Sequence, residues 1–143
     1  MEPRDLAIAQ ARGRIAVGLA FLVSPSLAGR LWVGGEARRA GARVLGRAFG
    51  VRDLALGLGV MIALDRGAPV RGWLEASALS DAGDFTAGLL DAGALPPLLR
   101  PGVLALGAGS SALAAWLARE LDSEGRPLPG TTPEAAATGH PGS

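Results

Sequence analysis

Six charged side chains lie inside stretches of the chain that are otherwise apolar. They are Arg14, Arg47, Arg52, Asp53, Asp81 and Asp84. An arginine can hold an anionic or carbonyl group through its planar guanidinium, and an aspartate can accept a proton or contact a cation. At the centre of a bilayer each such charge costs about 2.5–3.5 kcal/mol. Charges of this kind therefore face the protein interior and pair, which predicts a charge network or a ligand site.

Counting residues from the turns places these charges at one level. If antiparallel helices meet near Gly67, then Asp53, 14 residues before it, lies level with Asp81, 14 residues after it. Arg14 lies 10 residues before Ser24, where the first apolar stretch ends. Ten helical residues span about 15 Å, which is half the thickness of a hydrocarbon core. The three arginines and three aspartates also balance in charge, as a desolvated network requires.

Helical spacing puts only some of these charges on a shared face. Ser77, Asp81 and Asp84 stand at i, i+4 and i+7 and form one stripe. Arg52 points about 140° away from Arg47 at 100° per residue, so the second stretch cannot aim all its charges at one point. Two interpretations stay open. One is a structural network that fixes helix packing and register, and the other is a polar pocket for a ligand, a proton or a lipid headgroup.

Composition excludes several other chemistries. The 143-residue chain has no Cys and a single His, His140. Disulfides, cysteine-ligated metals and a thiol nucleophile are therefore excluded, and we expect no metal site and no cofactor. The chain has no P-loop, no nucleophile elbow, no zinc-protease motif and no EF-hand loop. A formal net charge of +1 does not suggest a nucleic-acid partner.

Four apolar stretches must supply the elements that position the charges. Ala and Leu dominate them, none alternates with period two, and Pro and Gly clusters separate them. This pattern predicts an all-α fold, an antiparallel up-down four-helix transmembrane bundle. We expect it to occupy residues 1–120, with helices at about 5–24, 40–64, 70–91 and 101–119, followed by a disordered tail at 121–143.

The last apolar stretch favours a membrane protein over a soluble one. Residues 102–118 contain no charge, and only Ser110 and Ser111, about halfway along, interrupt them. A surface helix of a soluble protein needs a polar stripe, and a chain of this size could hardly bury a whole helix. Trp32, Trp73 and Trp116 lie near predicted helix ends, which is typical of residues at a membrane interface. A soluble helical interaction domain is the alternative.

The chain ends leave two further questions open. Arginines precede a nine-residue apolar core at 15–23, and Ser26 and Ala28 form a small-x-small pattern, so residues 1–28 could be a cleaved signal peptide. The acidic residues near the start argue against it. Seven arginines on the side of the termini, against five opposite, favour termini in the cytoplasm.

One motif resembles a known family. Arg47 to Asp53 match R-x-[FL]-G-x-R-D, and this run, with Gly13-Arg14 and the segment 81–84, resembles a family of small four-helix integral membrane proteins from high-GC bacteria. The resemblance covers roughly residues 6–120. It implies the fold and the choice of polar residues, and because the family has no known function it supplies no reaction.

Two functions compete for the charged residues. The first is a multi-pass protein of the bacterial inner membrane, without catalysis, whose charges hold it together or bind a small ligand. Its partners would be the lipid bilayer, a lipophilic small molecule or a second copy of the chain. The second is a small membrane enzyme acting on a quinone, an isoprenoid or a polyketide. In that enzyme Arg47 and Arg52 would polarise an oxygen, and Asp53, Asp81 or Asp84 would move a proton.

Overall fold

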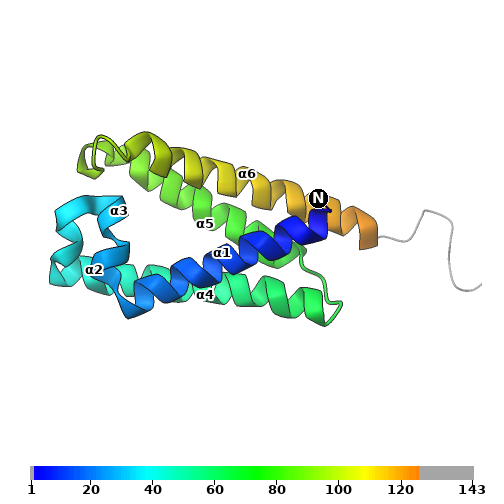
Figure 1. The fold of residues 1–143 in the computed structure, drawn as a ribbon. Coiled ribbons are helices and arrows are strands. Elements are labelled where there is room, and N and C mark those ends of the chain that lie inside the picture. Colours follow the sequence, from blue (N-terminus) through cyan, green and yellow to red (C-terminus); the bar gives the residue numbers. More distant parts are fainter. Residues whose placement is uncertain (1, 126–143) are drawn as a thin grey trace, which may run out of the picture.

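The computed structural model describes the backbone of residues 2–125 and the side chains as far as Asp122. Nearly all of this range is helical and it contains no strand, which confirms the predicted all-α fold. Four long helices carry the architecture (Figure 1). They are α1 (Pro3–Val23), α4 (Ala40–Asp65), α5 (Arg71–Leu90) and α6 (Arg100–Gly125).

The elements differ from the predicted ones in three places. The connection after α1 was expected to be only a helix break, but it holds α2 (Pro25–Ala28), α3 (Arg30–Val33) and the 3-10 turn η1 (Gly34–Arg38). A second 3-10 turn, η2 (Ala92–Ala94), lies between α5 and α6. Helix α6 continues to Gly125, so the first residues of the predicted tail are helical. The rest of that tail, with His140, lies outside the described residues.

Proline and glycine explain where the helices begin and end. At Ser24 the backbone leaves the helical conformation, and Pro25 begins α2, because proline suits a first helical position where its missing N–H is not needed. Gly34 and Gly67 end α3 and α4 with φ angles of +58° and +61°. Residues with a Cβ rarely adopt this left-handed conformation, so glycine is the natural residue at both ends.

The long helices form two pairs. Helix α1 packs along α4, and α5 packs along α6, whereas the two pairs contact each other much less. Figure 1 shows α5 and α6 running side by side and α1 lying along α4. We call these the α1–α4 pair and the α5–α6 pair. Because few contacts join the two pairs, the side chains that lie between them determine the distance and angle between the pairs.

Glycines bring α1 and α4 into backbone contact. A Cβ added at Gly50 would lie 2.7 Å from the carbonyl oxygen of Gly18, and one at Gly18 would lie 2.7 Å from that of Gly50. A Cβ at Gly57 would lie 2.7 Å from the carbonyl oxygen of Ala11. Small residues allow such close approach of helices. Gly46 and Gly50, one helical turn apart, therefore both lie at the contact of α4 with the segment from α1 to Pro25.

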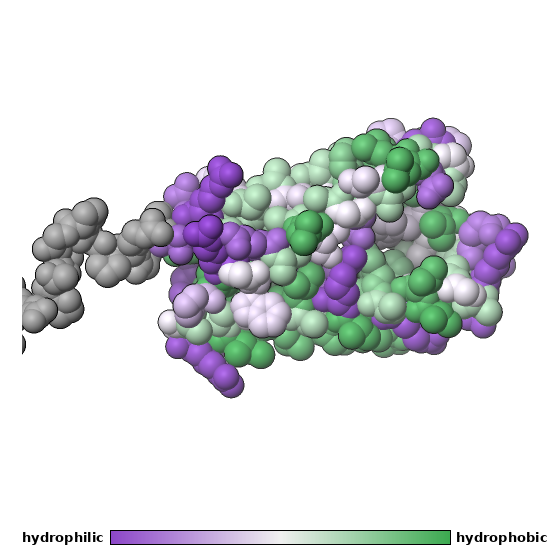
Figure 2. Space-filling model, turned by 180° about the vertical axis from the view of Figure 1, so that it is seen from behind, coloured by the Kyte–Doolittle hydropathy of each residue, from purple (hydrophilic) through white to green (hydrophobic). Residues whose placement is uncertain are grey.

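One connected cluster of buried apolar side chains, which we call the dry core, lies at one end of the molecule. Its buried side chains come from the first turns of α1 and α5 and the last turns of α4 and α6, and include Ala7, Val60, Leu74 and Leu117. Seen from the side opposite to Figure 1, polar side chains gather at the two ends and mostly apolar surface lies between them (Figure 2). At the opposite end, the buried apolar side chains Phe21, Ala37 and Leu95 are separate from this core.

An exposed ion pair joins the two helices of the α5–α6 pair at the core end. Arg71 donates hydrogen bonds to Glu75 at 2.7 Å and to Asp122 at 2.8 Å. The hydrogen bonds to these two carboxylates raise the pKa of the Arg71 guanidinium above its usual value. Arg71 is solvated, so this pair ties the helix ends without contributing much to stability.

Gly50→Ala should destabilise the protein. The new methyl group would meet backbone atoms of α1 that cannot move aside, and overpacking of this kind costs about 1–3 kcal/mol. Gly83→Ala is the matched control, because nothing lies within 4 Å of its added Cβ and alanine favours a helix over glycine by about 0.5–1 kcal/mol. Thermal unfolding followed by circular dichroism should show a lower midpoint for Gly50→Ala alone. Equal midpoints for the two variants would contradict the close α1–α4 contact.

Candidate ligand cleft and charge network

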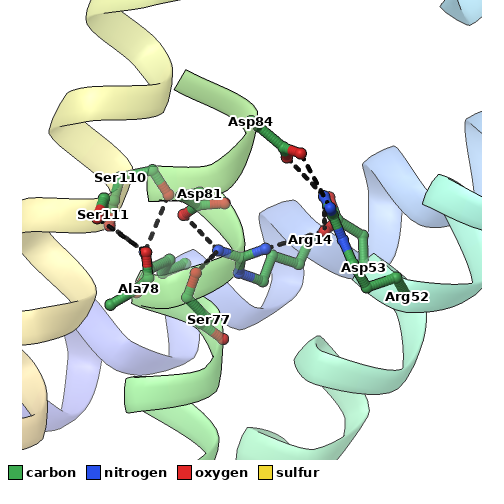
Figure 3. Close-up of polar contacts among 10 residues, drawn as sticks. Arg14, Arg52, Asp53, Ser77, Ala78, Asp81, Asp84, Ser110 and Ser111 are labelled. Atoms are coloured by element: carbon green, nitrogen blue, oxygen red, sulfur yellow. Dashed lines mark hydrogen bonds and ion pairs between the residues drawn. The ribbon is translucent and has the colours of Figure 1, made fainter. Parts of the chain in front are cut away.

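Arg14 joins three helices. Its side chain is 6% exposed. One terminal nitrogen donates a hydrogen bond of 2.9 Å to Oδ1 of Asp53 in α4. The other donates to Oδ2 of Asp81 in α5 and, at 3.2 Å, to the backbone carbonyl of Ser77. Figure 3 shows the guanidinium reaching between the two carboxylates.

A second arginine makes a parallel connection. Both terminal nitrogens of Arg52 donate to Asp84, at 2.9 and 2.6 Å, in the bidentate geometry that suits a guanidinium. One of them also lies 3.4 Å from Asp53. The guanidinium stands 4.4 Å from the centre of the Phe49 ring, a cation–π contact. Arg52 and Asp84 are about one-third exposed, so this pair lies nearer the surface than Arg14.

The structure brings together five of the six predicted charges and leaves one out. Arg14, Arg52, Asp53, Asp81 and Asp84 form one connected set, which we call the charge network. Arg47 is exposed and makes no hydrogen bond or ion pair with the described residues. The reason is the 140° offset between Arg47 and Arg52 on α4. The predicted charge balance is therefore wrong: two arginines face three aspartates.

Helix α6 contributes hydroxyl groups to the same level. The amide nitrogen of Gln10 in α1 donates to the carbonyl and the hydroxyl of Ser110, at 3.0 and 3.1 Å. Ser111 donates to the carbonyl of Ala78 in α5 at 2.8 Å. Both serines were placed at this level by counting residues. Gln10 was missed, although it stands one turn before Arg14 on the same face of α1.

Three polar atoms near the network have no partner among the described residues. They are Nε of Arg14, Nε of Arg52 and Oγ of Ser77, all buried. Most buried polar groups in proteins have a hydrogen-bond partner. The network therefore retains hydrogen-bonding capacity that its own side chains do not use.

A cleft lies between the two helix pairs, on the side of the network away from the dry core. One part has a volume of about 440 Å³ and an adjoining part about 270 Å³. Trp32, Phe49, Asp84 and Val103 line both parts, so the two are continuous. This volume is in the range of small-molecule sites, which are about 300–1,000 Å³.

Aromatic rings form one wall of the cleft. The ring of Phe21 lies 5.8 Å from that of Trp32 and 4.8 Å from that of Phe49, and Trp32 lies 6.1 Å from Phe49. Trp32 was predicted to be an interfacial residue. It lines the cleft instead, because the short helices α2 and α3 fold it back over α1 and α4. Trp73 and Trp116 are 43% and 42% exposed, and their position at a membrane interface stays a prediction.

The polar wall of the cleft is acidic. Asp53, Asp81 and Asp84 of the network line it together with Arg14, and Asp91 lines the larger part. Within the described residues, no three carboxylate or histidine side chains come close enough to hold a metal ion. The site can therefore offer an apolar aromatic surface and carboxylate oxygens to a bound molecule, since the terminal nitrogens of Arg14 already donate to protein acceptors.

Comparison of the chain with protein-family models, curated proteins and solved structures gives no significant match. The family resemblance of the Arg47-to-Asp53 motif therefore stays a prediction. The interpretation of the site rests on its geometry.

Removing Arg14 should damage the fold far more than removing its partner Asp81. Arg14→Gln leaves three carboxylates facing one arginine, and breaking a buried pair in this way costs about 3–5 kcal/mol. Asp81→Asn instead restores the charge balance and keeps a hydrogen-bond acceptor, so it should cost about 1 kcal/mol or less.

Thermal unfolding of the two variants in detergent measures this asymmetry, and Arg47→Gln is the control that should leave the midpoint unchanged. Equal losses for Arg14→Gln and Asp81→Asn would show that the network carries no excess of negative charge.

Proposed function

We propose that the chain is a four-helix, multi-pass protein of the bacterial inner membrane that binds a small lipophilic molecule in the cleft. In this proposal the charge network fixes the spacing of the two helix pairs and thereby holds the cleft open. The observation that carries it is the position of the cleft, which lies between the pairs, beside the network, with aromatic side chains opposite carboxylates.

Exposed apolar surface supports the membrane part of the proposal. Helices α1 and α6 are long and apolar enough to cross a bilayer, and only 28% and 17% of their apolar windows are buried. The core helix of a soluble protein would be mostly buried. Large side chains such as Leu19, Leu79 and Leu106 are 47%, 75% and 59% exposed. Patches of this kind mark membrane or partner contacts.

The placement of the charges explains how α4 and α5 would also span the bilayer. The charged side chains halfway along these helices, such as Arg52 and Asp81, face the other helix pair. The ion pairs of Arg14 with Asp53 and Asp81 are almost completely buried. Intramembrane charges behave in this way when they are tolerated. The resemblance of the Arg47-to-Asp53 motif to a family of bacterial membrane proteins supports the same placement.

The geometry does not favour the enzyme hypothesis. That hypothesis needs Arg47 and Arg52 to polarise a substrate oxygen. Arg47 is exposed, and both terminal nitrogens of Arg52 already donate to Asp84. The terminal nitrogens of Arg14 and Arg52, which would stabilise a developing negative charge in a bidentate way, are therefore already used by the aspartates.

Cysteine accessibility tests the membrane placement without background, because the chain contains no Cys. In membrane vesicles, Leu106→Cys, an exposed position about two turns into α6, should resist a membrane-impermeant maleimide because lipid covers it. Gly35→Cys and Ala68→Cys, exposed positions in turns at opposite ends, should react in vesicles opened to both sides. Rapid labelling of Leu106→Cys in sealed or opened vesicles would contradict insertion and favour a soluble interaction domain.

The fluorescence of Trp32 can report directly on binding in the cleft. With Trp73 and Trp116 replaced by Phe, titration with the neutral quencher para-dibromobenzene in lipid nanodiscs should quench Trp32 saturably, because its ring lines the cavity. A variant that keeps only Trp116, which lies at the surface, reports simple partitioning into lipid and should be quenched linearly. Val103→Phe should weaken the quenching of Trp32 by filling the cleft. Linear quenching of both tryptophans would mean that the cleft binds no lipophile.

A further inference from the structure

The charge network has one carboxylate too many. Arg14 and Arg52 face Asp53, Asp81 and Asp84, so the connected set carries a formal charge of −1. Arg47, which would have balanced it, points elsewhere. In a low-dielectric interior an uncompensated charge is costly. The network is therefore incomplete without a positive charge from outside its own side chains.

The surplus negative charge lies on the side that borders the cleft. Both terminal nitrogens of Arg52 donate to Asp84, and one of them reaches Asp53 only at 3.4 Å, so Arg14 is the nearer partner of Asp53 and the partner of Asp81. Each of these two carboxylates accepts hydrogen bonds through one oxygen only. The second oxygen of each has no partner among the described residues, and both residues line the cleft.

The opposite wall suits a cation as well. Faces of Phe and Trp rings attract positive charge, and Arg52 already uses the Phe49 ring in this way. The rings of Phe21 and Trp32 continue this wall, and Asp91, an exposed carboxylate without a partner among the described residues, lines the larger part of the cleft. An anion would meet four carboxylates here, and a metal ion would find too few oxygen ligands.

We propose that the molecule bound in the cleft is a lipophilic organic cation, with its apolar body against the aromatic wall and its positive centre facing Asp81 and Asp53. This inference rests on the proposed function, because it names the ligand class of the same cleft. A bound cation would complete the charge balance of the network and would exchange with the lipid phase, since both parts of the cleft are open.

A matched pair of ions of one shape tests the sign of the charge. Tetraphenylphosphonium and tetraphenylborate have the same four phenyl groups and opposite charges. Each is titrated into nanodiscs of zwitterionic lipid containing the variant in which Trp32 is the sole tryptophan. The Trp116-only variant corrects for partitioning into lipid. The phosphonium should bind saturably and at least about tenfold more tightly than the borate.

Substitution of one carboxylate identifies the groups that recognise the charge. Asp81→Asn should abolish most of the preference for the phosphonium, because it removes the surplus charge. Asp65→Asn removes the same charge from an exposed position at the end of α4 and should leave the preference unchanged. Asp81→Asn is expected to fold, so its loss of preference can be measured by the same titration.

The outcomes separate this inference from the proposed function. Equal saturable binding of both ions, or tighter binding of the borate, would overturn the cation inference and leave lipophile binding intact. If Asp81→Asn prefers the phosphonium as strongly as the parent does, the cation inference is also overturned. This result is expected if a bound proton already neutralises the charge network. Saturable binding of neither ion would contradict both proposals.

Discussion

The arrangement of this protein depends on the buried guanidinium of Arg14. It hydrogen-bonds to a carboxylate of its own helix pair, Asp53, and to one of the other pair, Asp81. Arg52 makes a similar connection to Asp84, but it lies nearer the surface. The two pairs otherwise touch lightly. The dry core therefore lies on one side of this contact and the cleft on the other, and the charge network forms the boundary between them.

The glycines of α1 and α4 make this contact geometrically accessible. Backbone contact at Gly18–Gly50 and at Ala11–Gly57 brackets the level of Arg14 and Asp53, so their side chains need not bend outward to meet. A wider separation of the helices would turn a direct ion pair into a hydrated one. The packing of small residues and the burial of the ion pair therefore depend on each other. The glycines determine the distance between α1 and α4, and at this distance Arg14 and Asp53 can pair directly.

The sequence predicted those features that follow from helix geometry, and it did not predict those that depend on tertiary packing. Counting residues from the turns placed Arg14, Asp53 and Asp81 at one level, because antiparallel helices rise equally per residue. The angle between Arg47 and Arg52 showed that α4 could not direct both inward, but not which one would be left out. The cleft and the inward position of Trp32 could not be predicted, because they depend on α2 and α3, whose Pro and Gly residues suggested only helix breaks.

The most direct test of the central interaction is a distance measurement between the two pairs. Spin labels at Leu19→Cys in α1 and Leu79→Cys in α5, both exposed, can be read by double electron–electron resonance in nanodiscs without other cysteines. If Arg14 sets the spacing, the parent gives a narrow distance distribution, and Arg14→Gln gives a broad or shifted one. An identical narrow distribution in Arg14→Gln would show that other contacts hold the pairs together.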